Sequence, residues 1–146
     1  MKRKLKNILA MLLAVMLIFS ATPATASAAG RKPTPGKVTL TQISSPAYNK
    51  INIKWNRTSN ATHYKIYYKK AGAGQWTSLA TVSGSATSYT HTSSKSRPVT
   101  PGQKYTYTVR GYNSRYKTYG SYDSRGLTTY TKPATVKLNR ASLGAD

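Results

Sequence analysis

The stretch from Pro101 to Asn113 restricts the fold of this chain most, because its residues alternate between two faces with a period of two. Aromatic and β-branched residues in this alternation predict a β-strand with one face buried. The Pro-Gly pair that opens the stretch predicts a turn just before the strand. One face would carry Tyr105, Tyr107, Val109 and Gly111, and the other Thr106, Thr108, Arg110 and Tyr112.

Shorter runs with the same alternation fill most of the chain after residue 36, and none of them has the period of a helix. Short strands separated by turn residues predict an all-β fold, a seven-stranded immunoglobulin-like sandwich of two sheets. The predicted strands are 37–43, 50–56, 63–70, 75–82, 87–92, 101–113 and 122–131. The side chains expected in the core are Ile51, Ile53, Trp55, Tyr64, Ile66, Tyr105 and Val109.

The order of motifs on three of these strands resembles the fibronectin type III domain, in particular its bacterial extracellular forms. The motifs are Ile51-x-Ile53-x-Trp55, Tyr64-x-Ile66-x-Tyr68 and Pro101-Gly102-x-x-Tyr105-x-x-x-Val109-x-Gly111. The resemblance implies that Trp55 packs in the core. It also implies that Tyr105 forms a tyrosine corner, in which its hydroxyl binds the backbone of the preceding connection. It covers residues 35–131 and implies a fold more than a function, because this sandwich serves many unrelated binding tasks.

The first 28 residues have the order of a secretory signal peptide. Four basic residues among the first six precede an apolar run of 12 from Ile8 to Phe19, and small residues follow. A membrane anchor is the alternative, but a span needs about 20 apolar residues. We therefore predict a secreted or cell-surface protein, cleaved near Ala28, that meets the membrane only in transit. Residues 29–36 would be a basic, proline-rich lead-in to the domain at 37–131.

Positive charge is the second strong constraint. From residue 29 onward the chain has 19 Lys and Arg residues (23 minus the four before that point) against Asp123 and Asp146, a formal charge of +17. Such a surplus often indicates disorder, but 12 tyrosines and two tryptophans in alternating runs favour a folded domain. A folded domain with this charge suits a polyanionic partner or an anionic surface. A generally basic proteome is the alternative explanation.

Residues 132–146 include a segment that resembles the start of the predicted domain. Residues 133–142 match residues 35–44 at four of ten positions, at an offset of 98 residues, which is close to the length of one such domain. Self-similarity at a fixed period is typical of repeat arrays. We predict that this tail begins a second module; chance similarity in a basic tail is the alternative.

The chain has few residues that could act in catalysis or bind a metal ion. The chain has two Asp, no Glu, no Cys, and two histidines, His63 and His91, far apart in the sequence. General acid–base catalysis needs positioned carboxylates or histidines, and metal sites need clustered ligands. No serine lies in a nucleophile-elbow motif. We predict a non-enzymatic protein that uses neither a cofactor nor a metal.

The first candidate binding site is the loop that follows the strand at 101–113. Tyrosine supplies rigid contact area, and Ser, Gly and Asn supply adaptable hydrogen bonds, a composition typical of binding loops on sandwich scaffolds. The resemblance likewise implies recognition by the loop between the last two strands. A solvated loop that only covers one end of the sandwich is the alternative. The candidate residues are Tyr112, Arg115, Tyr116, Lys117, Tyr119 and Tyr122.

The second candidate is a sheet face. If the strands at 63–70 and 101–113 are neighbours, as the resemblance implies, six side chains share one solvent-facing side. Cations set between aromatic rings suit anionic polymers, whereas the alternative is that they only keep the face soluble and discourage edge pairing. The six residues are Lys65, Tyr67, Lys69, Thr108, Arg110 and Tyr112.

We therefore expect an exported adhesion or binding module that associates with anionic cell-wall polymers, such as teichoic acid, or with acidic polysaccharide. Other surface proteins are a further class of partner. A passive spacer module from a longer protein is the alternative, and it would have no ligand of its own. Nucleic acid fits the charge, but the sequence has no dedicated motif for it, so we do not expect it as the partner.

Overall fold

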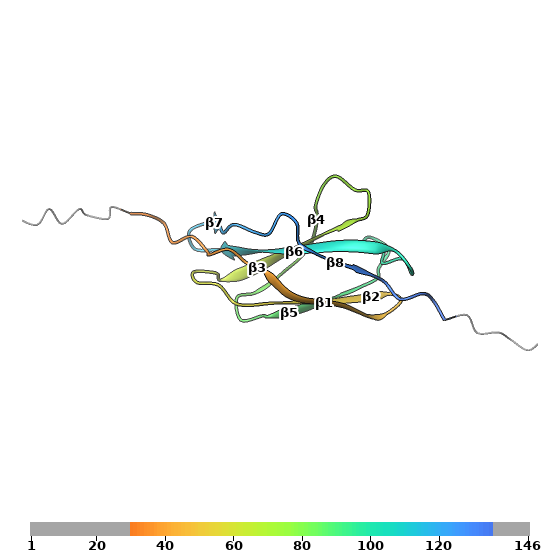
Figure 1. Ribbon diagram of the computed structural model, residues 1–146. Helices are drawn as coiled ribbons and strands as arrows, with labels where there is room; N and C mark the ends of the chain where they lie inside the picture. The colour runs from red at the N-terminus through yellow and green to blue at the C-terminus, as the bar shows by residue number, and fades with distance from the viewer. Residues whose placement is uncertain (1–29, 136–146) are drawn as a thin grey trace, which may run out of the picture. The chain divides into compact units, whose positions relative to one another are not determined.

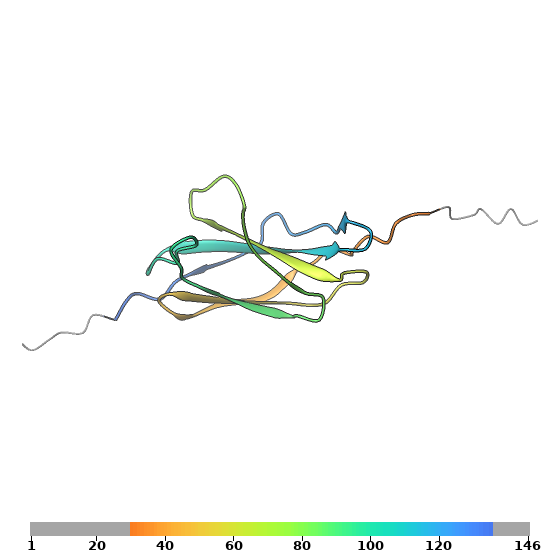
Figure 2. The same cartoon turned by 180° about the vertical axis from the view of Figure 1, so that it is seen from behind.

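A computed structural model describes residues 30–135, whose compact unit begins at Lys32. These residues form two antiparallel sheets that lie face to face (Figures 1 and 2). One sheet has the order β1-β2-β5, and the other has the order β4-β3-β6-β7, with β8 also paired to β6. The fold is thus the predicted all-β sandwich. The strands are β1 (Leu40–Ala47), β2 (Lys50–Trp55), β3 (His63–Lys70), β4 (Thr77–Ser83), β5 (Ser88–Thr92), β6 (Lys104–Asn113), β7 (Thr118–Tyr119) and β8 (Leu127–Tyr130).

The core lies between the two sheets and is built by side chains that point inward from alternate positions. On β3 the buried side chains are every second residue, and β6 follows the same period except for Thr108, which is buried as well. Complete burial of an aliphatic side chain of this kind stabilises the fold by about 1.5–3 kcal/mol. The seven side chains expected in the core are all buried: Ile51, Ile53, Trp55, Tyr64, Ile66, Tyr105 and Val109.

Tyr105 ties the connection before β6 to the core. The backbone amide of Thr100 donates a hydrogen bond to its hydroxyl at 3.0 Å, and the hydroxyl donates to the carbonyl of Pro98 at 3.3 Å. Both bonds satisfy backbone groups that no strand pairs, so the connection is held without a ladder of its own. Trp55 packs its ring edge-on against Tyr64, with 5.6 Å between centroids. These are the places that the resemblance implied for the two residues.

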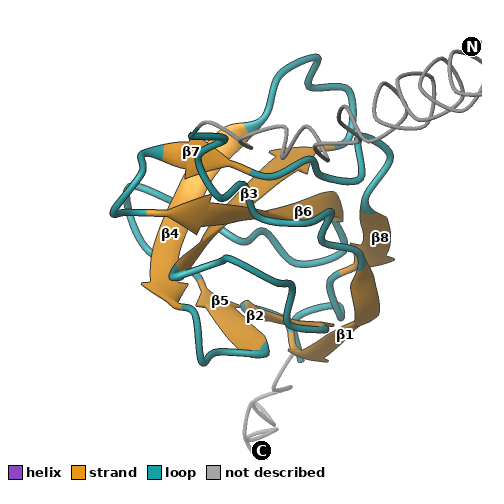
Figure 3. Cartoon of the chain, turned by 90° about the vertical axis from the view of Figure 1, so that its left-hand side faces the viewer, coloured by secondary structure: helices purple, strands orange, loops and turns teal. Residues whose placement is uncertain are grey.

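The edge beside β6 differs from the predicted strand at 122–131 and the predicted loop before it. β6 continues through a hairpin into β7, where Tyr112 pairs with Tyr119. The chain then leaves the sheet and returns as β8, where Leu127 pairs with Tyr107. Figure 3 shows the two short strands near opposite ends of β6. The loop predicted at 113–121 therefore contains a short strand, β7, and the strand predicted at 122–131 is reduced to β8 after an excursion at residues 120–126.

This excursion covers part of the outer sheet face. The hydroxyl of Thr108 donates to the carbonyl of Asp123 at 2.8 Å, so Thr108, which we expected to face solvent, is buried. The chain can rejoin the sheet because Gly126 has a φ of +65°, and a Cβ there would collide with the carbonyl oxygen of Tyr107.

The proline-rich lead-in is part of the folded domain. Pro35 is buried, and the hydroxyl of Thr118 donates to the carbonyl of Pro33 at 2.7 Å. A Cβ on Gly120 would lie 2.6 Å from the carbonyl oxygen of Gly36, so the close approach of the two segments requires glycine. Residues 33–36 therefore pack against the sandwich.

The first strand also lies later than predicted. β1 extends to Ala47, which pairs with Lys50, beyond the predicted end at residue 43. The predicted signal peptide at 1–28 lies outside the described residues, as does most of the predicted tail module, at 136–146. In the part of the chain that the structure describes, no helix is long and apolar enough to cross a membrane.

Candidate functional site

The structure brings the two candidate sites together on the outer face of the larger sheet. Strands β3 and β6 are neighbours, and Lys65 is the direct antiparallel partner of Arg110. The hairpin after β6 adds tyrosines to the same place. We call the resulting surface the cation–tyrosine face and define it as Lys65, Arg110, Tyr112, Tyr119 and Tyr122.

Both cations of this face lie over aromatic rings. The Lys65 Nζ is 5.1 Å from the ring centroid of Tyr112 and 5.3 Å from that of Tyr119. The Arg110 Cζ is 4.8 Å from the centroid of Tyr119 and 5.6 Å from that of Tyr122. The negative π-faces attract both cations, which offsets part of the repulsion between two like charges in partner positions.

Arg110 is held in one orientation by the excursion after β7. Its Nε donates to the carbonyl of Gly120 at 2.7 Å. A guanidinium has five N–H donors. Among residues 30–135, the Arg110 side chain makes this one hydrogen bond, so its two terminal nitrogens are left for a ligand. Beside it, the phenol of Tyr119 raises the pKa of the Lys65 ammonium, which keeps this amine charged.

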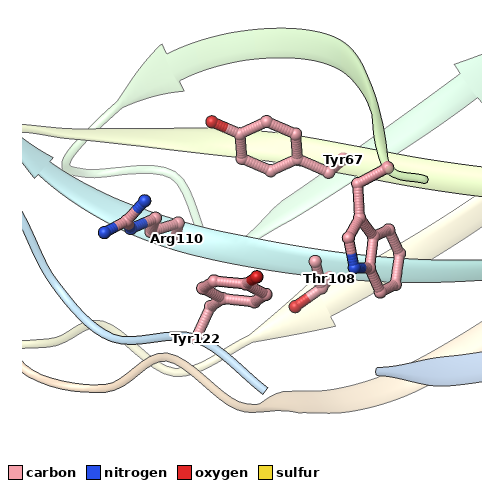
Figure 4. A pocket seen from close by; sticks show the side chains of 5 residues that line it. Tyr67, Thr108, Arg110 and Tyr122 are labelled. Atoms are coloured by element: carbon pink, nitrogen blue, oxygen red, sulfur yellow. The ribbon is translucent and has the colours of Figure 1, made fainter. Parts of the chain in front are cut away.

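A hollow of about 130 Å³ opens next to Arg110 (Figure 4). Rings of Tyr67 and Tyr122 stand on either side of it, and Trp76 also lines it. Sequence reasoning placed Trp76 only in a short strand. Its role depends on the β3–β4 turn, which places it beside Lys69, with the Nζ 4.7 Å from the indole centroid. The alternation of Lys65, Tyr67 and Lys69 before that turn was the one available signal. The lining residues are Tyr67, Trp76, Thr108, Arg110 and Tyr122.

The remaining loop candidates lie away from this face, at the tip of the β6–β7 hairpin. Arg115 is exposed with its Cζ 5.4 Å from the ring centroid of Tyr116, and Lys117 has a φ of +54° in the turn. The tip is held by Asn113, whose side chain accepts from the amide of Tyr116 at 3.2 Å and donates to the carbonyl of Asn60 at 2.8 Å. The predicted loop site is thus divided between the sheet face and the hairpin tip.

His91 has a structural position in the core. His91 is buried between the sheets, where its Nδ1 lies 2.6 Å from the Tyr107 hydroxyl and its Nε2 lies 3.2 Å from the carbonyl of Arg97. A carbonyl only accepts, so Nε2 carries the proton and Nδ1 accepts from Tyr107. Burial lowers the pKa of His91 and raises that of Tyr107. Among the described residues, no group of three or more His, Cys, Asp or Glu side chains could hold a metal ion.

Solved structures resemble this sandwich, although no model of a known family matches the chain and no curated protein matches it. The FN5 domain of Drosophila Lar matches with a TM-score of 0.52 and 16% identity, over 69% of this chain and 100% of that one. The fn3 domain of human contactin 1 matches with a TM-score of 0.55 and 15% identity, over 78% and 96%. The FN1–FN3 domains of chicken CNTN1 match with a TM-score of 0.56 and 20% identity, over 68% and 31%.

These matches establish the class of fold. The chain is an all-β two-sheet sandwich with the fibronectin type III fold. At 15–20% identity these matches show the fold alone. Which ligand such a sandwich takes depends on the side chains grafted on it and not on the fold.

Proposed function

We propose that this chain is an exported, non-catalytic binding module that attaches to an anionic polymer through its cation–tyrosine face. The observation that carries the proposal is the partner position of Lys65 and Arg110, both set over the ring of Tyr119. Like charges directly opposite each other destabilise a sheet by about 0.2–1 kcal/mol. An anion that binds between them removes this repulsion, which makes the pair a favourable site for a phosphate or carboxylate.

The charge of the surrounding chain supports a polymer as the ligand. Between residues 30 and 135 the sequence has a single acidic side chain, Asp123, and its carboxylate accepts a hydrogen bond from the amide of Arg125 at 3.1 Å. A surface of one sign attracts an extended polyanion over its whole length. The predicted signal peptide adds export, so the proposed polymer is an anionic cell-wall polymer or acidic polysaccharide outside the cell. Other surface proteins are a further class of partner.

The experiment is to measure the binding of residues 29–146, which contain the compact unit, to purified bacterial cell walls before and after their anionic polymers are removed. The proposal predicts binding that is lost on removal and weakens as salt rises. Binding that survives removal, or no binding to either preparation, would contradict it.

A spacer is the second candidate function. Within the compact unit, the two described ends of the chain leave the sandwich from opposite ends (Figures 1 and 2), which suits modules joined in series. A spacer predicts no binding to any wall preparation, so the same experiment separates the two functions.

A further inference from the structure

We infer that the hollow beside Arg110 is a subsite for one uronic acid ring of an acidic polysaccharide. This inference rests on the proposed function, because it names the class of polyanion that the face takes. The hollow has about 130 Å³. This is roughly ten times the room that one water needs, and it is comparable with about a dozen heavy atoms of a single sugar ring.

The walls of the hollow suit a flat ring with an apolar face. Three of its five lining side chains are aromatic: Tyr67 from β3, Trp76 from the turn before β4, and Tyr122 from the excursion after β7. In Figure 4 the two tyrosine rings stand on either side of Arg110 and Thr108. Aromatic walls with a few placed polar groups are typical of ligand pockets, and the C–H face of a pyranose ring is apolar enough to pack on them.

Arg110 supplies the anion-binding group at one side of the hollow. Its Nε is occupied by the carbonyl of Gly120, so the side chain cannot swing freely, and its terminal N–H groups are left for a bidentate bond to a carboxylate. A uronate carries its carboxylate directly on the ring, so one ligand unit satisfies the guanidinium and the aromatic walls together. A poly(glycerol phosphate) chain has the anion but no ring for these walls.

Two lysines flank the hollow along β3. Lys65 and Lys69 are four residues apart, about 13 Å along a strand, with Tyr67 between them. Lys65 lies beside Tyr112 and Tyr119, and Lys69 beside Trp76. The neighbouring rings of a bound polyuronate would therefore place their carboxylates near a cation on each side.

Trp76 provides a direct measurement of occupancy. The other tryptophan, Trp55, is only 2% exposed in the core, so its fluorescence should not respond to a surface ligand. We expect tri-galacturonate to change the emission of residues 29–146 at about 0.5 M NaCl, where weak non-specific attraction is screened. A neutral trisaccharide, glucose 6-sulfate and a glycerol phosphate oligomer serve as comparison ligands, and each should bind at least about tenfold more weakly.

Arg110→Lys keeps the charge but removes the bidentate fork, and should weaken tri-galacturonate binding about tenfold. Arg115→Lys makes the same change at the hairpin tip and should leave binding within about twofold. Tyr122→Ala removes one aromatic wall of the hollow. Because the Tyr122 side chain is 37% exposed, the fold should persist, while calorimetry should show weaker binding of tri-galacturonate.

Two failures can be told apart by a binding assay with the wall polymer at low salt. If the polymer binds but tri-galacturonate does not, or if the sulfated sugar or phosphate oligomer binds better, the uronate subsite is wrong and the proposed function stands. If no polyanion binds at low salt, both are wrong. Equal affinity of Arg110→Lys and the unchanged chain for tri-galacturonate would also overturn the subsite.

Discussion

Lys65 on β3 and Arg110 on β6 occupy directly opposite positions in the antiparallel register, and both cations lie within 5.3 Å of the ring centroid of Tyr119. The arrangement combines a repulsion that weakens the free domain with an attraction to the aromatic ring. A binding site for an anion has this property, because the ligand removes the repulsion that the fold tolerates.

The first prediction concerns this repulsion. Raising salt from about 10 mM to 200 mM should stabilise the domain, because it screens the excess of positive charge. Lys65→Gln should reduce this gain by about 0.2–1 kcal/mol, as urea unfolding at the two salt concentrations would measure. Lys54→Gln is the control, because exposed Lys54 is paired with Gln42 and Ser88 in the other sheet. An equal salt response of the two variants would contradict the coupling of Lys65 to Arg110.

The second prediction concerns the tyrosine corner. Tyr105→Phe removes the acceptor of the Thr100 amide and the donor to the Pro98 carbonyl, so the free energy of unfolding should fall by about 1–3 kcal/mol. Tyr130→Phe changes a side chain that is 63% exposed and should alter stability by less than about 0.5 kcal/mol. Urea unfolding of both variants tests the difference. Similar losses of unfolding free energy in the two variants would show that the tyrosine corner contributes no more to stability than an exposed tyrosine.

The third prediction concerns pH. Burial lowers the pKa of His91, so the native state stays neutral while the unfolded chain takes up a proton below about pH 6.5. The unfolded state binds more protons there, so stability rises with pH and is lost as pH falls from about 6.5 toward the lowered native value. His91→Gln should flatten the stability profile in this window, measured as unfolding free energy from pH 5 to 7.5.

His63→Gln is the control for the pH experiment. His63 is half-buried at the start of β3, beside the hydroxyl of Thr62, with Nδ1 3.0 Å from Oγ1. Its replacement should leave the acid-side loss in place. If His63→Gln flattens the profile instead, the assignment of the pH dependence to the core histidine is wrong.

The fourth prediction concerns the lead-in. Gly120→Ala would bring a Cβ within 2.6 Å of the Gly36 carbonyl oxygen, and one of the two segments must move. We expect a loss of about 1–3 kcal/mol and faster amide exchange at Val38, whose amide is bonded to Ser121. Gly74→Ala, where no atom lies within 4 Å of the added Cβ, is the matched control and should be neutral or slightly stabilising. Equal free energies of unfolding for the Gly120→Ala and Gly74→Ala variants would contradict close packing of the lead-in against the sandwich.

The sandwich could be predicted from the sequence because its strands carry a local signal. On β2, one polar residue separates Ile51 from Ile53 and another separates Ile53 from Trp55. The same period of two marks β3 and β6. The sheet order and the partners of β3 required the resemblance, since alternation identifies a buried face but not the neighbouring strand.

The features that the sequence did not reveal depend on contacts between distant residues. Thr108 looked solvent-facing by its position, and only the excursion after β7 covers it. Trp76 joins the site through the β3–β4 turn, and Pro35 is buried against Gly111 of β6, whose Cβ would lie 2.8 Å from it. No local sequence pattern identifies the contacts of these residues, because those contacts are determined by long-range packing and not by local propensity.

The most direct test of a defined binding site on the cation–tyrosine face is the salt dependence of binding to an anionic wall polymer, compared between two double variants. Lys65→Gln with Arg110→Gln removes both cations of the cation–tyrosine face, whereas Lys54→Gln with Lys95→Gln removes the same charge from exposed positions elsewhere. The first pair should lower affinity strongly and reduce the slope of log affinity against log salt by about two units. The second pair should leave the slope nearly unchanged. Equal effects of the two pairs on affinity and slope would contradict a defined site and indicate general attraction by net charge alone.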